Sequence, residues 1–114
     1  MKSKIKYGII GSGLMGCEHI SNINLIDSAE VVAISDSNTN SIDNAKKLLS
    51  NDIKIYSNNN EIFKNDEVDA FIISTPNFTH YDIIKEALNT EKTYPPFKKP
   101  SKPFLLKTSL TLLL

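Results

Sequence analysis

The stretch KYGIIGSGLMGCEHI, residues 6–20, indicates how the chain folds, because a short apolar run stops at three glycines and a helical pattern then begins. Residues 5–10 are predicted to form a strand, since they end in a compact apolar run. From Leu14, apolar side chains recur at helical spacing as far as Ile23, which predicts a helix. The glycines therefore lie where a strand hands over to a helix.

Strand and helix patterns continue to alternate along the chain. Buried strands are predicted at residues 29–35 and 70–74, and a shorter strand with one exposed face at 53–56. Helical faces are predicted from Ile42, Ala45, Leu48 and Leu49, from one turn around Ile62 and Phe63, and from Ile83, Ile84, Ala87 and Leu88, with Thr79 and Asp82 spaced as a capping box. This order predicts an α/β fold: a Rossmann-like parallel sheet of strand order 3-2-1-4 with helices on both faces.

The three glycines form the motif G-x-G-x-x-G at the predicted turn. In dinucleotide-binding folds the first glycine, here Gly11, permits a tight turn, and the second, Gly13, lets a pyrophosphate approach the backbone. The third, Gly16, lets the helix pack closely on the strand. The N–H groups at the start of the helix, where its dipole is positive, would then face the phosphates.

Asp36 closes the second predicted strand, 20 residues after Gly16. A carboxylate there accepts both hydroxyls of an adenine ribose and repels a 2′-phosphate. Ser37 follows it, and the segment DSNTN contains no Arg or Lys, which favours NAD over NADP. The alternative is that the glycines only make a tight turn and that Asp36 only caps the next helix.

A second polar segment, STPNFTH at residues 74–80, follows the fourth predicted strand. Ligands of open α/β sheets bind beyond the carboxyl ends of the strands, where this loop is expected to lie. Thr75 and Asn77 offer polar groups to a ribose or a nicotinamide amide, and Pro76 fixes the backbone. The alternative is a turn with a helix cap, which we favour for Thr79, and His80 is predicted to position or pack rather than to act as a base.

The composition excludes several classes of function. Net charge is zero overall, and residues 1–91 carry 8 Lys, no Arg and 13 acidic residues, which argues against a nucleic-acid partner. The longest apolar runs are too short to span a membrane, and the start of the chain does not resemble a signal peptide, so a cytoplasmic location is expected. Cys17 cannot form an internal disulfide and is predicted to pack in the core. No Cys and His spacing indicates a zinc site.

Residues 4–92 resemble the nucleotide-binding domain of the glucose-fructose oxidoreductase and inositol dehydrogenase (Gfo/Idh/MocA) family, through YGIIGSGLMGCEHI, VVAISDSN and DAFIISTPNFTHYDIIKEAL. The resemblance implies hydride transfer between a nicotinamide and a sugar, cyclitol or related carbonyl compound. It implies that Asp36 holds the adenine ribose. It also implies pyrophosphate contacts by Gly11, Ser12, Gly13, Leu14 and Met15, and a nicotinamide side lined by Thr75, Pro76, Asn77 and His80.

The chain departs from the family's pattern after Lys92. Family members continue with His, a short strand and then Glu-Lys-Pro, whose Lys is catalytic, and they carry a second domain that binds the substrate. Here Lys98-Lys99-Pro100 resembles that motif but lacks the Glu, so we assign no catalytic residue. A missing C-terminal domain encoded downstream is a possible partner.

Residues 93–114 have a different composition from the rest, with no Ile, Asn, Gly, Asp or Glu and with four of the five prolines. Thr93-Tyr94-Pro95-Pro96 can be encoded as ACA TAT CCT CCT, which one nucleotide later gives His-Ile-Leu and then Leu. The hypothesis is an out-of-frame or disordered tail at 93–114 after an NAD(P)-binding domain at 1–92. Pro95 and Pro96 also disfavour a fifth strand, so the fourth strand is expected to form an edge.

Three functions remain open from the sequence. The first is the NAD(P)-binding domain of an oxidoreductase, inactive alone as a truncated fragment, so that enzyme activity of the chain itself is left undecided. The second is a stand-alone NAD-binding module that senses or regulates. The third is a non-functional fragment. A methyltransferase is disfavoured by Gly16 and by the T-P-N loop.

Overall fold

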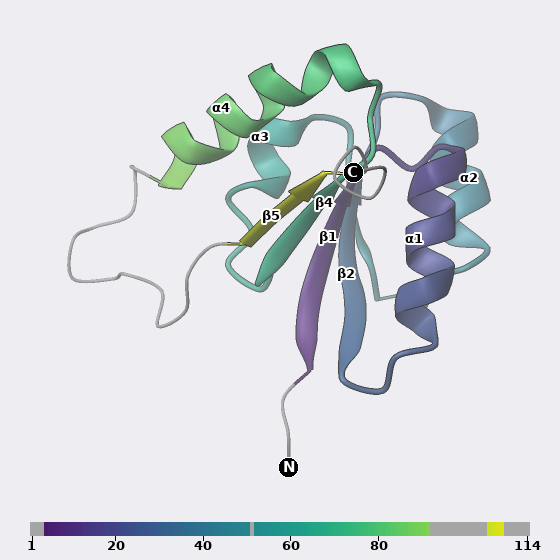
Figure 1. Ribbon diagram of the computed structural model, residues 1–114. Helices are drawn as coiled ribbons and strands as arrows, with labels where there is room; N and C mark the ends of the chain where they lie inside the picture. Colours follow the sequence, from purple (N-terminus) through teal and green to yellow (C-terminus); the bar gives the residue numbers. More distant parts are fainter. Residues whose placement is uncertain (1–3, 51, 92–104, 109–114) are drawn as a thin grey trace.

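The computed structural model describes residues 4–50, 52–91 and 105–108, and it forms one twisted parallel sheet with helices on both sides (Figure 1). The predicted alternation of strands and helices is confirmed. In chain order the elements are β1 (Ile5–Ile10), α1 (Leu14–Asn24), β2 (Ala29–Ser35), α2 (Thr39–Lys46), β3 (Lys54–Tyr56), α3 (Asn59–Ile62), β4 (Ala70–Ile73), the 3₁₀ turn η1 (Asn77–Thr79), α4 (His80–Glu91) and β5 (Leu105–Thr108).

The strands lie in the order β3-β2-β1-β4-β5, and each pair of neighbouring strands is parallel. The predicted order 3-2-1-4 is therefore confirmed for the first four strands. Strand β1 lies at the centre, with Ile9 opposite Ile34 of β2 and opposite Ile72 of β4. This arrangement brings the carboxyl ends of β1, β2 and β4 to one edge of the sheet, which is where ligands of such sheets bind.

The expectation that β4 forms an edge is wrong. Strand β5 lies parallel to β4, with Ala70 paired to Leu105 and Ile73 paired to Thr108 (Figure 1). Backbone pairing requires only N–H and C=O groups, so the prolines upstream of β5 do not prevent it. The other residues of the predicted tail, 93–104 and 109–114, lie outside the described part of the chain, and its out-of-frame origin stays a hypothesis.

Each face of the sheet carries its own layer of helices. Ile9 and Ile72 pack with Ile20 of α1 and Ala45 of α2 on one face. The neighbouring residues Ile10, Phe71 and Ile73 point to the other face, where they pack with Ile62 of α3 and with Ile83 and Ala87 of α4, because successive side chains of a strand alternate. Both faces are thus covered, as the apolar runs predicted.

Two local predictions are corrected. Helix α2 ends at Lys46, before Leu48 and Leu49, and Leu48 is 38% exposed, so the apolar spacing overestimated the helix. The predicted capping box is also wrong, because the backbone N–H of Thr79, which the side chain of Asp82 would accept from in such a box, donates to the carbonyl of Pro76 at 2.9 Å. In the described ranges, no helix has the length and apolar character needed to cross a bilayer.

Phe71→Ala is expected to lower the free energy of unfolding by about 3–5 kcal/mol, the usual cost of such a truncation in a core. Phe71 is 1% exposed, and its ring meets that of Phe63 edge to face at a centroid distance of 5.0 Å. Phe78→Ala is the control, because Phe78 is 84% exposed and should cost less than about 0.5 kcal/mol. Urea unfolding followed by circular dichroism measures both, and equal losses would contradict the assigned core.

Candidate functional site

The turn between β1 and α1 can be made only by glycine at its first position. Gly11 has a φ of +91°, which side chains other than glycine rarely adopt. A Cβ at Gly11 would also lie 2.8 Å from Cγ2 and 2.9 Å from the backbone nitrogen of Thr75. The Gly11 N–H donates to the carbonyl of Ser35 at 2.8 Å, which ties the turn to the end of β2.

The other two glycines differ sharply in their surroundings. A Cβ on Gly16 would lie 2.0 Å from the carbonyl oxygen of Gly11 and 3.1 Å from Oγ of Ser74, so α1 crosses the turn in direct backbone contact. A Cβ on Gly13 would meet nothing within 4 Å. Gly16 therefore serves packing, whereas Gly13 leaves open space at the start of α1, as the motif predicts.

Helix α1 begins without a side-chain cap. Gly13 is its N-cap residue, no side chain accepts a hydrogen bond from the first turn, and that turn contains no acidic residue. The first N–H groups of a helix have no partner within the helix, and the helix dipole makes this end positive. An anion is the natural partner for such a helix end.

The carboxylate of Asp36 holds the glycine turn in place. Its Oδ2 accepts from the Ser12 backbone N–H at 2.8 Å and lies 3.2 Å from the Ser12 hydroxyl, which also donates to it. Its Oδ1 accepts from the N–H of Asn38 at 2.8 Å. The cap of α2 is Asn38 itself, whose side chain accepts from the Ser41 N–H, so capping that helix is not the role of Asp36.

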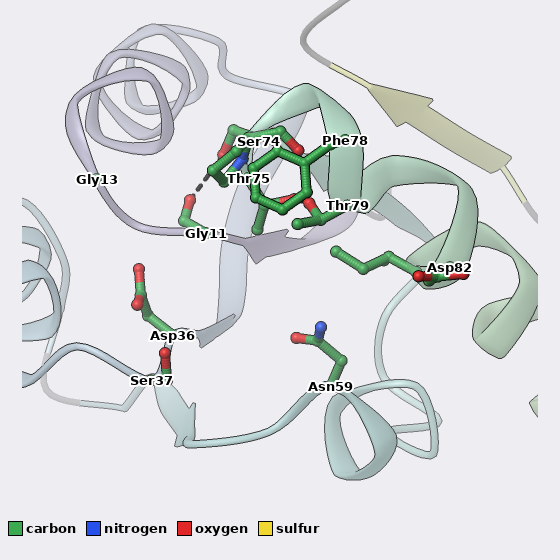
Figure 2. A pocket seen from close by; sticks show the side chains of 12 residues that line it. Gly11, Gly13, Asp36, Ser37, Asn59, Ser74, Thr75, Phe78, Thr79 and Asp82 are labelled. Atoms are coloured by element: carbon green, nitrogen blue, oxygen red, sulfur yellow. Dashed lines mark hydrogen bonds between the residues drawn. The ribbon is translucent and has the colours of Figure 1, made fainter.

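The loop after β4 presents one hydroxyl with a defined orientation. Thr79 Oγ1 donates its single hydrogen to the carbonyl of Pro76, and Thr75 Oγ1 lies 2.6 Å from Thr79 Oγ1. Thr75 must therefore donate to Thr79, which leaves the lone pairs of Thr75 Oγ1 to accept from a ligand. Ser74 Oγ donates to the carbonyl of Gly11 at 2.6 Å and joins this loop to the glycine turn (Figure 2).

His80 is buried beneath the loop that follows β4. It is 6% exposed, and its Nε2 lies 2.8 Å from the carbonyl oxygen of Thr75, with which it shares a hydrogen bond. This bond fixes the backbone of Thr75 from inside the fold. Its predicted place on the nicotinamide side stays a prediction.

These loops surround a pocket of about 580 Å³ beyond the carboxyl ends of the strands (Figure 2). It includes six residues predicted from the sequence as candidate contacts: Gly11, Gly13, Asp36, Ser37, Thr75 and Pro76. The other six candidates are not among its lining residues: Ser12, Leu14, Met15, Gly16, Asn77 and His80. Of these, Ser12 is fully buried, whereas the side chains of Leu14 and Met15 are 87% and 45% exposed.

Six further lining residues were not predicted as contacts: Asn59, Ser74, Phe78, Thr79, Asp82 and Ile83. Ser74, Phe78 and Thr79 belong to the loop that the sequence singled out, so the loop was found but the individual side chains were not. Asn59 lies in the polar run that follows β3. Its position beyond the carboxyl end of a strand could have marked it as a candidate contact, because ligands of such sheets bind there.

Cys17 is a partly buried thiol that packs against the core. Its Sγ lies 3.4 Å from the carbonyl oxygen of Ser12, to which it donates, and the side chain packs against the core between the sheet and α1. Burial raises the pKa of the thiol above its usual value, which disfavours the thiolate. Within residues 4–50, 52–91 and 105–108, no three His, Cys, Asp or Glu side chains group as metal ligands would.

Comparisons with known proteins agree with this geometry. The model of a family described as "Oxidoreductase family, NAD-binding Rossmann fold" (GFO_IDH_MocA) matches residues 5–94. The inositol 2-dehydrogenase/D-chiro-inositol 3-dehydrogenase of Lacticaseibacillus casei is 29% identical over 89 residues, which cover 77% of this chain and 26% of that protein. The chain thus spans about a quarter of the length of this curated relative.

Solved structures share the fold. The myo-inositol dehydrogenase of Lactobacillus casei in complex with NAD(H) and myo-inositol superposes with a TM-score of 0.72 at 24% identity, over 90% of this chain and 28% of that one. The scyllo-inositol dehydrogenase of the same organism, with bound NAD(H) and scyllo-inositol, has a TM-score of 0.67 at 30% identity. That match covers 77% of this chain and 26% of the other.

Gly16→Ala is expected to destabilise the fold by about 3 kcal/mol or more, because the added methyl group overlaps a backbone carbonyl that cannot move alone. Gly13→Ala is the matched control and should cost less than about 1 kcal/mol, since its Cβ enters open space. Chemical denaturation of both variants measures the difference. A Gly16→Ala protein as stable as Gly13→Ala would contradict the close crossing of α1 over the turn.

Proposed function

Since this chain belongs to the Gfo/Idh/MocA oxidoreductase family, whose matched region is an NAD-binding Rossmann fold, we propose that its pocket binds NAD and that it is the nucleotide-binding part of an oxidoreductase. The observation that carries the proposal is that Gly13 and Asp36 line one pocket. The first leaves room for a pyrophosphate and the second offers a carboxylate to a ribose. Together they would accommodate the pyrophosphate and the ribose of an adenosine diphosphate.

The residues divide the binding between them. The uncapped start of α1 faces the phosphates with its N–H groups, and Gly13 allows them to come close. The N–H of Ser12 is already bonded to Asp36, so Ser12 acts by holding that carboxylate. The pyrophosphate contact predicted for Ser12 therefore falls to the backbone that follows it.

The charge of the pocket supports NAD over NADP. Asp36 and Asp82 both line it, and none of the twelve lining residues is Lys or Arg. A 2′-phosphate on the adenine ribose would bring two further negative charges next to Asp36. Two like unit charges about 4 Å apart repel each other by about 1 kcal/mol in water. This repulsion is larger where the pocket excludes water.

The far end of the pocket suits the nicotinamide half. The lone pairs of Thr75 Oγ1 accept from a hydroxyl or an amide, and Pro76 lies next to it in the pocket wall. His80 and Ser74 hold this loop from beneath through the carbonyls of Thr75 and Gly11. When bound, NAD supplies or accepts the hydride, and the residues of this chain bind and orient it.

The full reaction that we propose is hydride transfer between the nicotinamide and a sugar, cyclitol or related carbonyl compound. The support is that relatives of this chain are named inositol dehydrogenases. This chain spans about a quarter of the first relative's length. We further propose that the chain works in the cytoplasm, since Cys17 is unpaired and needs no oxidising compartment.

We propose that residues 1–92 bind the cofactor but that the chain does not turn over substrate alone. The family's Glu-Lys-Pro segment is not present after Lys92, where Lys98-Lys99-Pro100 stands without a preceding Glu. A stand-alone NAD-binding module would bind NADH in the same way. An assay of substrate turnover distinguishes this module from part of an oxidoreductase only when a complementary domain is added.

Titration of the chain with NADH and with NADPH is expected to give at least about tenfold tighter binding of NADH. Asp36→Asn should narrow this difference, because the neutral amide no longer repels a 2′-phosphate. Fluorescence of the reduced nicotinamide measures both affinities. Tighter binding of NADPH by the wild-type chain would contradict the assignment of Asp36.

The control for this experiment is Asp27→Asn. Asp27 is exposed and lies between α1 and β2, at the opposite end of the strands from the pocket. The Asp27→Asn substitution removes the same charge as Asp36→Asn but far from the pocket. It should therefore leave the ratio of the NADH and NADPH affinities unchanged. If both variants shift the ratio equally, the preference comes from net charge rather than from contact with the ribose.

Incubation of the chain with NAD⁺ and myo-inositol is expected to produce no NADH above a protein-free blank, although the NADH titration shows binding. Absorbance at 340 nm follows the reaction, and an authentic inositol dehydrogenase is the positive control. Steady production of NADH in proportion to chain concentration would refute the proposed loss of turnover.

A further inference from the structure

The part of the pocket contributed by α3 has no role in the binding scheme above. Asn59, the first residue of α3, lines the pocket together with Asp36 and Ser37 (Figure 2). The cap of α3 is the preceding residue, Asn58, whose Oδ1 accepts from the Glu61 N–H at 3.1 Å. Helix formation therefore does not account for the side chain of Asn59.

Ser35 fixes the orientation of the Asn59 amide. Ser35 is 1% exposed, and its hydroxyl donates to Oδ1 of Asn59 at 2.9 Å. A buried hydroxyl hydrogen needs an acceptor, and a 180° rotation of the amide would replace that acceptor with an NH₂ group. Nδ2 is thus held away from Ser35, and Figure 2 shows it pointing into the open space of the pocket.

The pocket therefore presents groups of opposite kind at this end. Asp36 presents only acceptors, because an ionised carboxylate has no hydrogen to donate. Asn59 presents the two hydrogens of its Nδ2, while its Oδ1 accepts from Ser35. Strands β2 and β3, which precede these two residues, are adjacent in the sheet, so both lie on the half of the pocket away from β4.

The pocket also has apolar walls. Ile83 of α4 lines the pocket and belongs to the same core cluster as Ile62 of α3. Phe78 lines the pocket from η1 with 84% of its side chain exposed. Apolar and aromatic side chains suit the flat faces of a heteroaromatic ring, and the polar edge of that ring needs a separate partner.

We propose that Asn59 is a specificity-determining residue for the nucleobase: its Nδ2 donates to a ring nitrogen of adenine, and Ser35 is the positioning residue that aims it. The inference rests on the proposed function, because it takes Asp36 as the partner of the adenine ribose. A base attached to that ribose lies within this half of the pocket. The ring nitrogens of adenine are acceptors, so they match the donor hydrogens of Asn59 Nδ2.

The decisive variant is Asn59→Asp in the full chain. It keeps the size of the side chain and an acceptor for Ser35, but it replaces both donor hydrogens with a charged oxygen. It is expected to weaken NADH binding by about tenfold, and Asn59→Ala by about fivefold, as for the loss of one hydrogen bond. Asn60→Asp, at the exposed next position of α3, adds the same charge and should change the affinity less than about twofold.

ADP-ribose serves as the second ligand because it lacks the nicotinamide and retains the adenine. Equal weakening of NADH and ADP-ribose by Asn59→Asp would place Asn59 at the adenosine end, as inferred. Weakening of NADH alone would place it at the nicotinamide end and overturn the inference. Thermal unfolding of each variant checks that the fold is intact.

The role of Ser35 is tested with Ser35→Ala alone and in the Asn59→Ala background. Alone it should weaken NADH binding about threefold, because the amide can rotate and present its oxygen to the base. With Asn59 already truncated, it should have no further effect, and this coupling distinguishes positioning from a general loss of stability. Additive losses would contradict the positioning role.

The outcomes for the two proposals can be told apart. Wild-type chain that binds NADH, together with Asn59→Asp and Asn60→Asp variants of equal affinity, would overturn the role of Asn59 and leave the proposed function standing. Wild-type chain that binds neither NADH nor ADP-ribose would overturn both.

Discussion

The close approach of α1 to the glycine turn is the constraint on which the rest of the site depends. A Cβ on Gly16 would be 2.0 Å from the carbonyl oxygen of Gly11, so the two backbones touch. The same turn contacts Thr75 and Ser74 at the end of β4. One piece of backbone therefore sets the distance between the start of α1 and the loop after β4, and these are two walls of the pocket.

Asp36 links this turn to the next strand. Its carboxylate accepts from Ser12 on one side and from Asn38 on the other, so a single side chain orders the glycine turn and the start of α2. A ligand that donates hydrogen bonds to Asp36 must share a carboxylate that already accepts from Ser12 and Asn38. Each ionised carboxylate has about four lone-pair sites, which leaves capacity for a ribose hydroxyl.

The sequence predicted what local patterns control and missed what depends on distant backbone contacts. The strands β1 and β2 were predicted at their observed bounds, since apolar runs between glycines and polar turns define them. The pairing of β5 with β4 was missed, because prolines and composition say little about a strand that needs only a free sheet edge. Asn59 was missed because its place in the pocket depends on the buried hydroxyl of Ser35, 24 residues earlier.

The residues that line the pocket all come from the first four strand-to-helix connections of the sheet. They run from Gly11 to Ile83, and they come from the loops and helix starts that follow β1, β2, β3 and β4. Their mutual geometry is set by two buried clusters and by hydrogen bonds within residues 4–91. Cofactor binding, if the proposal is right, can therefore be measured on this part of the fold alone. The groups that line the pocket all lie between residues 11 and 83, so their identities do not depend on the sequence of residues 93–114.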